Sequence, residues 1–345
     1  MHPLFVMMVL APWLFQSQYT EVERVLTLGK KGGAGPTAFG EVREIELDEK
    51  GRLYVLDRMN NDIRVFDSGG KYINTIGRRG QGPGEFRSPL SLDYVDRQLF
   101  VTERGRVSRF GTNGGFLGMH RTNVPGISRA LPLKDGGVLV LRKGMARTSG
   151  YDARMLIGVY EGGRFSLVFS GPSPALFIQT PEGSRVFKTL FCPTLHLSPI
   201  TGGGYVVGDG TDGTLNRFSS DGTLVTRVKV AQPPKPLSEE EKKYLIDKAE
   251  DWAGGRHVNE LAIPPFKSAI CGLEAVDEET AWVRLEYEGE EGQVWRLFDL
   301  EKREVKTTMR LPRGESATAF RGDWIVTHSK GELGADYVHL LKIVR

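Results

Sequence analysis

Short apolar runs recur six times along the chain, most of them directly after a glycine turn. They cover residues 51–57, 97–103, 136–142, 203–209, 279–285 and 322–328. Apolar side chains occupy both faces of each run, as expected for central strands that lie between neighbouring sheets. The pattern therefore predicts six copies of a small β-sheet, each with a fully buried central strand.

A second strand follows each central strand, and a third follows in most copies. Second strands are predicted at 62–67, 107–112, 156–161, 215–220, 294–299 and 338–343, and outer strands at 71–76, 116–120, 165–169, 224–230 and 305–311. Turns such as Asp67–Gly70 and Ser220–Gly222 separate the second strand from the outer strand and supply the positive φ of tight hairpins. These four-stranded units predict an all-β, six-bladed β-propeller.

The sixth copy has no outer strand of its own, because the sequence stops at Arg345. Residues 22–28 are a strand-like run followed by Gly29, much as Ile76 is followed by Gly77. We expect this N-terminal strand to close the last blade, which would remove an exposed sheet edge.

Gly77–Phe86 leads into Ser88–Asp93 and follows Asp57–Asp67, and a degenerate copy of the first segment covers Gly29–Phe39. These segments resemble NHL-type repeats and the related bacterial six-bladed propellers, most strongly over residues 25–120. The resemblance implies the same propeller fold, and it identifies no function.

The spacing of central strands points to one insertion. It is 46 residues from Leu53 to Leu99 and 76 residues from Tyr205 to Ala281. Residues 238–254 within that stretch predict an amphipathic helix between blades four and five, with Ser238 and Glu241 as a capping box. The helix is expected to pack on the rim, to cover a ligand site or to dock a partner.

Composition fits one soluble domain over residues 19–345, expected to be monomeric. The 43 glycines supply turns, and 46 basic against 43 acidic residues give a charge of +3, which does not suggest nucleic acid. Residues 4–15 are apolar but too short to span a bilayer. We read residues 1–18 as a possible signal segment and expect a periplasmic or extracellular protein; a misassigned start or a buried strand would make it cytoplasmic.

Candidate binding residues lie at one mouth of the predicted central channel. The positions at or before the start of each inner strand are Arg43, Arg87, Arg129, Thr194, Lys267 and Thr318, and the central strands end nearby at Asp57, Glu103, Asp209 and His328. Because four of the six ring positions are basic, we expect an anionic small molecule or an acidic peptide end to bind there. The predicted ligand-binding set is Arg43, Arg87, Arg129, Lys267, Asp57, Asp209 and His328. The alternative is that these cations pair with carboxylates such as Glu41, Glu44 or Glu85.

The function we expect is a non-catalytic ligand- or protein-binding propeller without a metal or other cofactor. The alternative is a metal-dependent lyase or hydrolase in the channel. Six-bladed enzymes of that kind imply several inward-pointing ligands, whereas His196 and His328 are the two histidines expected near the channel. Cys192 and Cys271 fall near the starts of neighbouring inner strands. They are expected to form a disulfide if the protein is exported, or otherwise to be two separate buried thiols.

Overall fold

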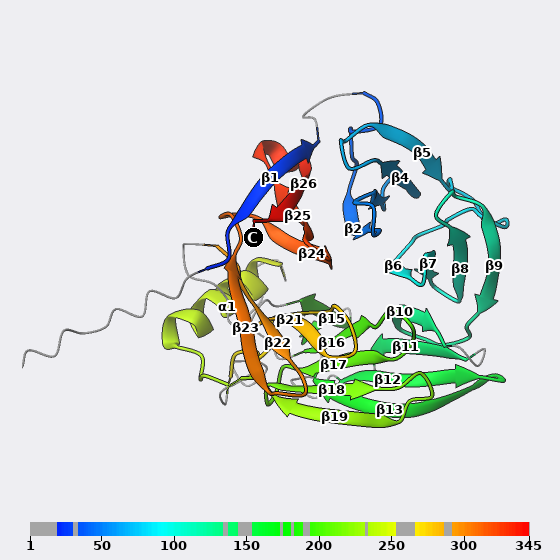
Figure 1. The fold of residues 1–345 in the computed structure, drawn as a ribbon. Coiled ribbons are helices and arrows are strands. Elements are labelled where there is room, and N and C mark those ends of the chain that lie inside the picture. The colour runs from blue at the N-terminus through cyan, green and yellow to red at the C-terminus, as the bar shows by residue number, and fades with distance from the viewer. Residues whose placement is uncertain are drawn as a thin grey trace, which may run out of the picture.

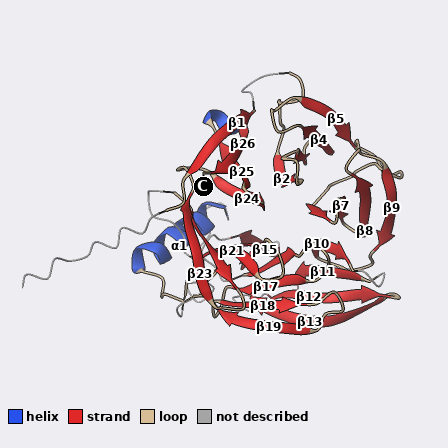
Figure 2. Ribbon diagram, in the orientation of Figure 1, coloured by secondary structure: helices blue, strands red, loops and turns tan. Residues whose placement is uncertain are grey.

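The computed structural model describes residues 19–29, 34–133, 137–143, 154–172, 175–180, 183–188, 194–231, 234–252, 266–285 and 292–344. These residues form six four-stranded antiparallel sheets arranged as blades around a central axis (Figure 1). The all-β, six-bladed propeller expected from the repeats is therefore confirmed. Figure 2 shows how strongly strands dominate the described chain.

The first three blades follow one another without a break in strand order. Blade one comprises β2 (Val42–Leu47), β3 (Leu53–Asp57), β4 (Asp62–Phe66) and β5 (Tyr72–Ile76). Blade two comprises β6 (Ser91–Val95), β7 (Gln98–Glu103), β8 (Arg106–Gly111) and β9 (Phe116–Arg121). Blade three comprises β10 (Ile127–Pro132), β11 (Val138–Lys143), β12 (Arg154–Glu161) and β13 (Arg164–Pro172). In each blade the first strand lies nearest the axis.

The remaining blades repeat this order, except that the last borrows a strand. Blade four comprises β16 (Leu195–Pro199), β17 (Tyr205–Asp209), β18 (Thr214–Phe218) and β19 (Leu224–Lys229). Blade five comprises β20 (Gly272–Ala275), β21 (Thr280–Arg284), β22 (Val294–Asp299) and β23 (Glu304–Arg310). Blade six comprises β24 (Ser316–Arg321), β25 (Trp324–Lys330), β26 (Asp336–Ile343) and β1 (Val22–Leu28), with a short 3₁₀ turn, η2, at Glu332–Gly334.

The N-terminal strand closes the ring as predicted. β1 pairs antiparallel with β26, with Val22 opposite Ile343 and Leu28 opposite Val338. Leu28 is buried in a cluster with Val338, Leu340 and residues of blade one. This pairing covers the edge of β26 and joins the two ends of the described chain in one sheet.

Two segments interrupt the blade order. The predicted helix is present between blades four and five as α1 (Glu239–Trp252). Its capping box is confirmed, because the Ser238 amide donates to Glu241 Oε2 (2.9 Å) and the Glu241 amide donates to Ser238 Oγ (3.2 Å). A hairpin of β14 (Ala175–Thr180) and β15 (Gly183–Lys188) separates blades three and four. This second interruption differs from the single insertion expected from the strand spacing.

The hydrophobic core lies between neighbouring blades rather than at the axis. All five residues of β3 are fully buried, which explains why this strand is apolar on both faces. Between blades one and two, Tyr54 stacks on Tyr94 with ring centroids 6.1 Å apart. In the described part of the chain, no helix is long and apolar enough to cross a membrane.

Candidate functional site

A hollow of about 650 Å³ opens where the inner strands of blades one to three begin; we call it the mouth pocket. Its lining residues are Arg43, Arg58, Leu90, Arg104, Gly105, Val124, Pro125, Gly126, Ile127, Ser128 and Lys143. The start of an inner strand and the end of its central strand share this edge, as Val42 opposite Asp57 shows. Both sets of residues therefore contribute to one opening.

β-bulges help to place the lining side chains. The pairing register of blade one shifts between Val42 and Glu44, so Arg43 is the extra residue of a bulge. Blade three has a corresponding shift between Ile127 and Arg129, with Ser128 as the extra residue. A bulge bends the strand and changes the direction of its extra side chain. Both extra residues line the mouth pocket.

The pocket has four cationic side chains, and three of them occupy corresponding places in consecutive blades. Arg58 and Arg104 directly follow the central strands β3 and β7, and Lys143 ends β11. Arg58 pairs with Glu41 through a 3.0 Å contact between Nη1 and Oε1. Arg43 Nε donates to the carbonyl oxygen of Leu90 over 3.2 Å. Arg43, Arg104 and Lys143 form no ion pair with any described residue, so the pocket carries a surplus of positive charge.

Next to the pocket, the inner strands carry a group of charged side chains that we call the axial cluster. Its members are Glu44 and Glu46 on β2, Asp93 on β6, Arg129 on β10, Glu274 on β20 and Arg321 on β24. Arg129 Nε donates to Asp93 Oδ1 (2.6 Å), and Arg129 Nη1 donates to the Leu197 carbonyl oxygen (2.6 Å). Arg129 of blade three is thereby fixed to blades two and four.

The carboxylates of the axial cluster hold protons more tightly than ordinary carboxylates do. Removal from solvent raises the pKa of Glu44 to about 7, although Arg129 opposes the shift. Burial likewise raises the pKa of Glu274 to about 7, again against Arg129. Burial together with the neighbouring Glu274 raises the pKa of Glu46 well above its usual range. At neutral pH the cluster is therefore partly protonated.

The opposite end of the axis is crossed by side-chain contacts between blades. Asp96 Oδ1 accepts a hydrogen bond from the Gly202 amide over 2.8 Å, which joins a turn of blade two to a turn of blade four. Arg321 of blade six donates to Thr201 Oγ1 and to the Tyr94 carbonyl oxygen, each over 3.4 Å. These contacts tie three alternate blades together at this end.

The structure places the predicted ligand-binding residues in several different surroundings. Arg43 lines the mouth pocket, and Arg129 lies in the axial cluster. The Arg87 side chain is exposed outside the pocket lining, and its amide donates to Glu103 Oε1 over 2.6 Å. Lys267 Nζ lies 2.5 Å from Glu241 Oε1, a contact that fixes α1 to the approach to β20. Of these four residues, Arg43 is the one that lines the mouth pocket.

The acidic and histidine positions take part in connections within and between blades. Asp209 Oδ1 accepts the Thr211 amide over 2.8 Å. His328 Nε2 contacts Asp336 Oδ1 over 2.5 Å, and Asp336 Oδ2 also accepts the Val42 amide of blade one over 3.1 Å. A ligand-binding role for these residues stays a prediction.

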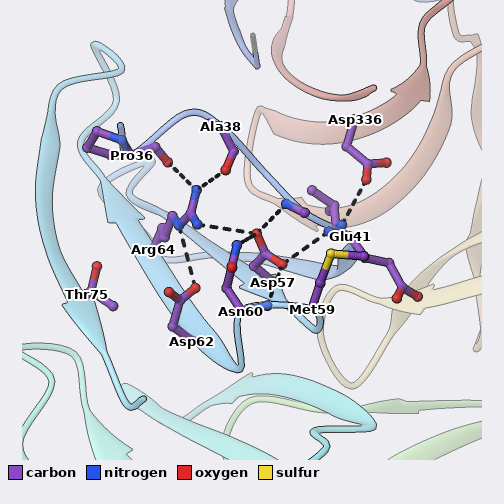
Figure 3. A network of polar contacts seen from close by, with 12 residues as sticks. Pro36, Ala38, Glu41, Asp57, Met59, Asn60, Asp62, Arg64, Thr75 and Asp336 are labelled. Carbon is purple, nitrogen blue, oxygen red and sulfur yellow. Dashed lines mark hydrogen bonds and ion pairs between the residues drawn. The ribbon is translucent and has the colours of Figure 1, made fainter. Parts of the chain in front are cut away.

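Asp57 is fully buried and fixes the segment that leads into blade one (Figure 3). It accepts the amides of Gly40 (2.7 Å) and Glu41 (3.1 Å), and its Oδ2 lies 3.5 Å from Arg64 Nη2. Arg64 Nη1 in turn donates to the carbonyl oxygens of Pro36 and Ala38. Asp57 thus accepts hydrogen bonds from the backbone amides of this segment, and Arg64 donates hydrogen bonds to its carbonyl oxygens.

Blade two repeats this arrangement. Glu103 accepts the amides of Arg87 and Ser88, while Arg106 donates to the carbonyl oxygens of Gln81 and Glu85. Arg106 Nε also contacts Glu103 Oε2 over 2.6 Å. An acid and an arginine of each blade, Asp57 with Arg64 and Glu103 with Arg106, therefore hold the two segments whose sequences look like repeats.

The histidines and cysteines offer no metal site among the residues described. His196 Nε2 contacts the Ile270 carbonyl oxygen over 3.1 Å, and burial lowers the pKa of this histidine to about 4. No three His, Cys, Asp or Glu side chains of the described residues are arranged to hold a metal ion. The pairing of Cys271 with Cys192 stays a prediction, because Cys192 lies outside the described residues.

Sequence reasoning missed most of the axial cluster. A signal was available in β2, where Glu44 and Glu46 alternate with the buried Ile45 and Leu47. Such alternation places the two carboxylates on one face of the strand. Arg58, Arg104 and Lys143 also went unnoticed, although each stands at or just after the end of a predicted central strand.

Comparison with known proteins supports the fold. Residues 37–120 match DUF5128, a family described as a 6-bladed beta-propeller. A crystal structure of a candidate exported protein from Bacteroides fragilis is 17% identical, with a TM-score of 0.53 over 94% of this chain and 95% of the other. A DUF4221 family member from Bacteroides vulgatus is 11% identical, also with a TM-score of 0.53, over 95% of this chain and 100% of the other. The search of curated proteins found no match. The chain is thus similar to bacterial proteins that share its fold.

Proposed function

We propose that this propeller is a non-catalytic binding protein that takes an anionic small molecule into the mouth pocket. The observation that carries the proposal is the surplus of cations: Arg43, Arg104 and Lys143 surround one hollow and form no ion pair with a described carboxylate. Guanidinium and ammonium groups in a partly enclosed site bind carboxylates, sulfates and phosphates through charge-assisted hydrogen bonds.

The pocket also suits a ligand with an apolar part. Val124, Pro125 and Ile127 line the same hollow, and Val124 and Ile127 are themselves buried. A volume of about 650 Å³ lies in the range of small-molecule sites. The expected ligand therefore carries one or two anionic groups on a compact organic body.

Helix α1 contributes no residue to this pocket, whose lining comes from blades one to three. In the chain, α1 lies between β19 of blade four and β20 of blade five. Leu245 and Ala249 of α1 are buried, and Lys267 pairs with Glu241, which supports a structural role for the helix on the rim. We accordingly assign ligand binding to the pocket and not to the helical insertion.

The proposal is tested by titrating the protein with sulfate and with oxalate in a calorimeter. Removing one charge-assisted hydrogen bond costs about 1.5–3 kcal/mol, so R104Q/K143Q should weaken binding at least about tenfold. The matched control is K229Q, which removes an exposed cation on β19 of blade four and should leave affinity unchanged. Failure of both anions to bind, or equal affinity in R104Q/K143Q and the wild type, would refute the proposal.

The metal-dependent lyase or hydrolase alternative gains no support from the residues described. We also propose export to the periplasm or beyond, on the strength of the apolar run at residues 4–15. Cell fractionation with N-terminal sequencing of the mature chain tests that location.

A further inference from the structure

Glu44 is the member of the axial cluster that directly follows a lining residue of the mouth pocket on β2. The residue before it, Arg43, lines the pocket and donates to Leu90, another lining residue. Glu44 Oε2 accepts the amide of Leu92 on β6 over 2.6 Å, and Leu92 is two residues after the lining residue Leu90. Glu44 is therefore next to the pocket lining on two elements, through Arg43 on its own strand and through the segment from Leu90 to Leu92.

Blade three has the same relationship. Ser128 lines the pocket, and the next residue, Arg129, faces the axial cluster and attracts Glu44. Because the charges of Arg43 and Arg129 both act on Glu44, the charge of an anion held by Arg43 would act on Glu44 and Arg129 as well.

The charged groups around Glu44 come from each neighbouring element. Asp93 on β6 repels it, Arg129 on β10 and Arg43 on β2 attract it, and Glu46 lies two residues further along its own strand. Arg321 on β24 faces Glu46 and Glu274. On β25, His328 and Lys330 are both committed to Asp336. Glu44 is thus the titratable carboxyl next to the pocket that is not neutralised by a direct ion pair with a described residue.

We propose that anion binding in the mouth pocket is coupled to protonation of Glu44, so that each bound anion brings a proton into the protein. The inference rests on the proposed function, because it requires the anion site to exist. Its physical basis is linkage: an anion next to a carboxyl favours the neutral form, and the neutral form in turn favours the anion. The protein therefore releases its ligand as the pH rises.

The direction of the effect follows from the pKa of Glu44, which is about 7 in the folded protein. Below that pH the carboxyl is neutral and the pocket cations act unopposed. Above it, the carboxylate repels the anion. If the bound anion shifts this pKa upward by one unit, affinity falls about tenfold between the two limits.

The experiment is calorimetric titration with sulfate, whose charge is constant between pH 6 and 8. We expect binding about fivefold tighter at pH 6 than at pH 8, because neither pH reaches its limiting value. We also expect an uptake of several tenths of a proton per sulfate near pH 7, measured from buffers of different ionisation enthalpy. E44Q should bind at pH 8 as tightly as the wild type binds at pH 6, with no proton uptake. E304Q, a matched change on the exposed strand β23, should retain the wild-type profile.

Three outcomes overturn the inference. Sulfate that binds without proton uptake leaves the anion site standing and removes the coupling. Proton uptake that persists in E44Q but disappears in E274Q assigns the proton to Glu274. Absence of sulfate binding removes the anion site itself. If E44Q fails to fold, infrared titration of the wild-type carboxyl signals with and without sulfate gives the same decision. The absence of an upward shift near pH 7 on adding sulfate would contradict the coupling.

Discussion

Arg129 Nε donates to Asp93 Oδ1 over 2.6 Å, and Asp93 is fully removed from solvent. The contact joins the inner strands of blades two and three at the axis. Further from the axis, blades one and two also pack through apolar and aromatic side chains, as Tyr54 and Tyr94 do. The ring is therefore held by an ionic contact near the axis and by hydrophobic packing further out.

Replacing Arg129 should be strongly destabilising, because Asp93 would then be a buried charge without a partner. For R129M we expect a loss of about 3–5 kcal/mol in the free energy of unfolding, measured by urea denaturation. The double variant R129M/D93N should recover at least half of that loss, since it removes both charges. R121M, on the exposed strand β9, is the control and should change stability by less than about 0.5 kcal/mol. Equal stability of R129M and R121M would show that the pair contributes nothing.

The blade pattern could be predicted from sequence because central strands are buried on both faces. That requirement makes residues such as Leu53, Tyr54 and Val55 apolar in succession, which is visible without a structure. Ring closure was also predictable, because one outer strand was lacking at the C-terminus and one strand was spare at the N-terminus. Both inferences depend on repetition within the chain.

The hairpin β14–β15 and the axial site went unpredicted for different reasons. The hairpin belongs to no repeat, but the spacing of 67 residues from Val138 to Tyr205 was a signal of an insertion that sequence reasoning missed. For the axial site, the repeat pattern puts Arg43 and Arg129 at equivalent ring positions. In the structure Arg43 is the extra residue of its bulge, whereas Arg129 follows the extra residue Ser128. A one-residue shift reverses the direction of a strand side chain, so one arginine lines the pocket and the other faces the axis.

Closure of the ring should depend on the buried end of β1. Leu28 packs against Val338 and Leu340, so L28A is expected to lose about 2–4 kcal/mol in the free energy of unfolding. V25A changes a side chain of the same strand that is 45% exposed, and it should cost well under 1 kcal/mol. Urea denaturation of both variants measures the difference. An L28A protein as stable as V25A would mean that β1 adds little to closure.

Asp57 should matter for stability more than for ligand binding. D57N removes the charge that faces the buried Arg64, and it places an NH2 donor opposite one of the two backbone amides, of Gly40 and Glu41, that the carboxylate accepts. We expect a loss of about 2–4 kcal/mol by denaturation, with sulfate affinity at 25 °C unchanged in the folded fraction. The contrast is D67N, a half-buried turn acid of the same blade whose hydrogen bonds to backbone amides are exposed, which should cost less than about 1 kcal/mol. A fall in sulfate affinity for D57N at full folding would support the ligand-binding role predicted from sequence.

Glu274 should make the protein less stable as the pH rises from about 5 to 7. Its pKa is about 7 in the folded protein, against 4.5 for an ordinary glutamate, because burial disfavours the carboxylate. Between these values the folded state binds more protons than the unfolded state, so the free energy of unfolding decreases with pH by up to about 1.4 kcal/mol per unit. Below the lower value both states are protonated, and above the higher value both are ionised.

E274Q removes this titration while retaining an oxygen that can accept the hydrogen bond from Ser198. The stability of E274Q relative to the wild type should therefore rise by about 1–3 kcal/mol between pH 5 and pH 8, measured by urea denaturation at each pH. E278Q is the matched control, because Glu278 belongs to the same blade but is 68% exposed; its difference from the wild type should stay constant. Because the comparison subtracts every carboxyl that the two proteins share, a flat E274Q difference would mean that Glu274 titrates in the folded protein as it does in water.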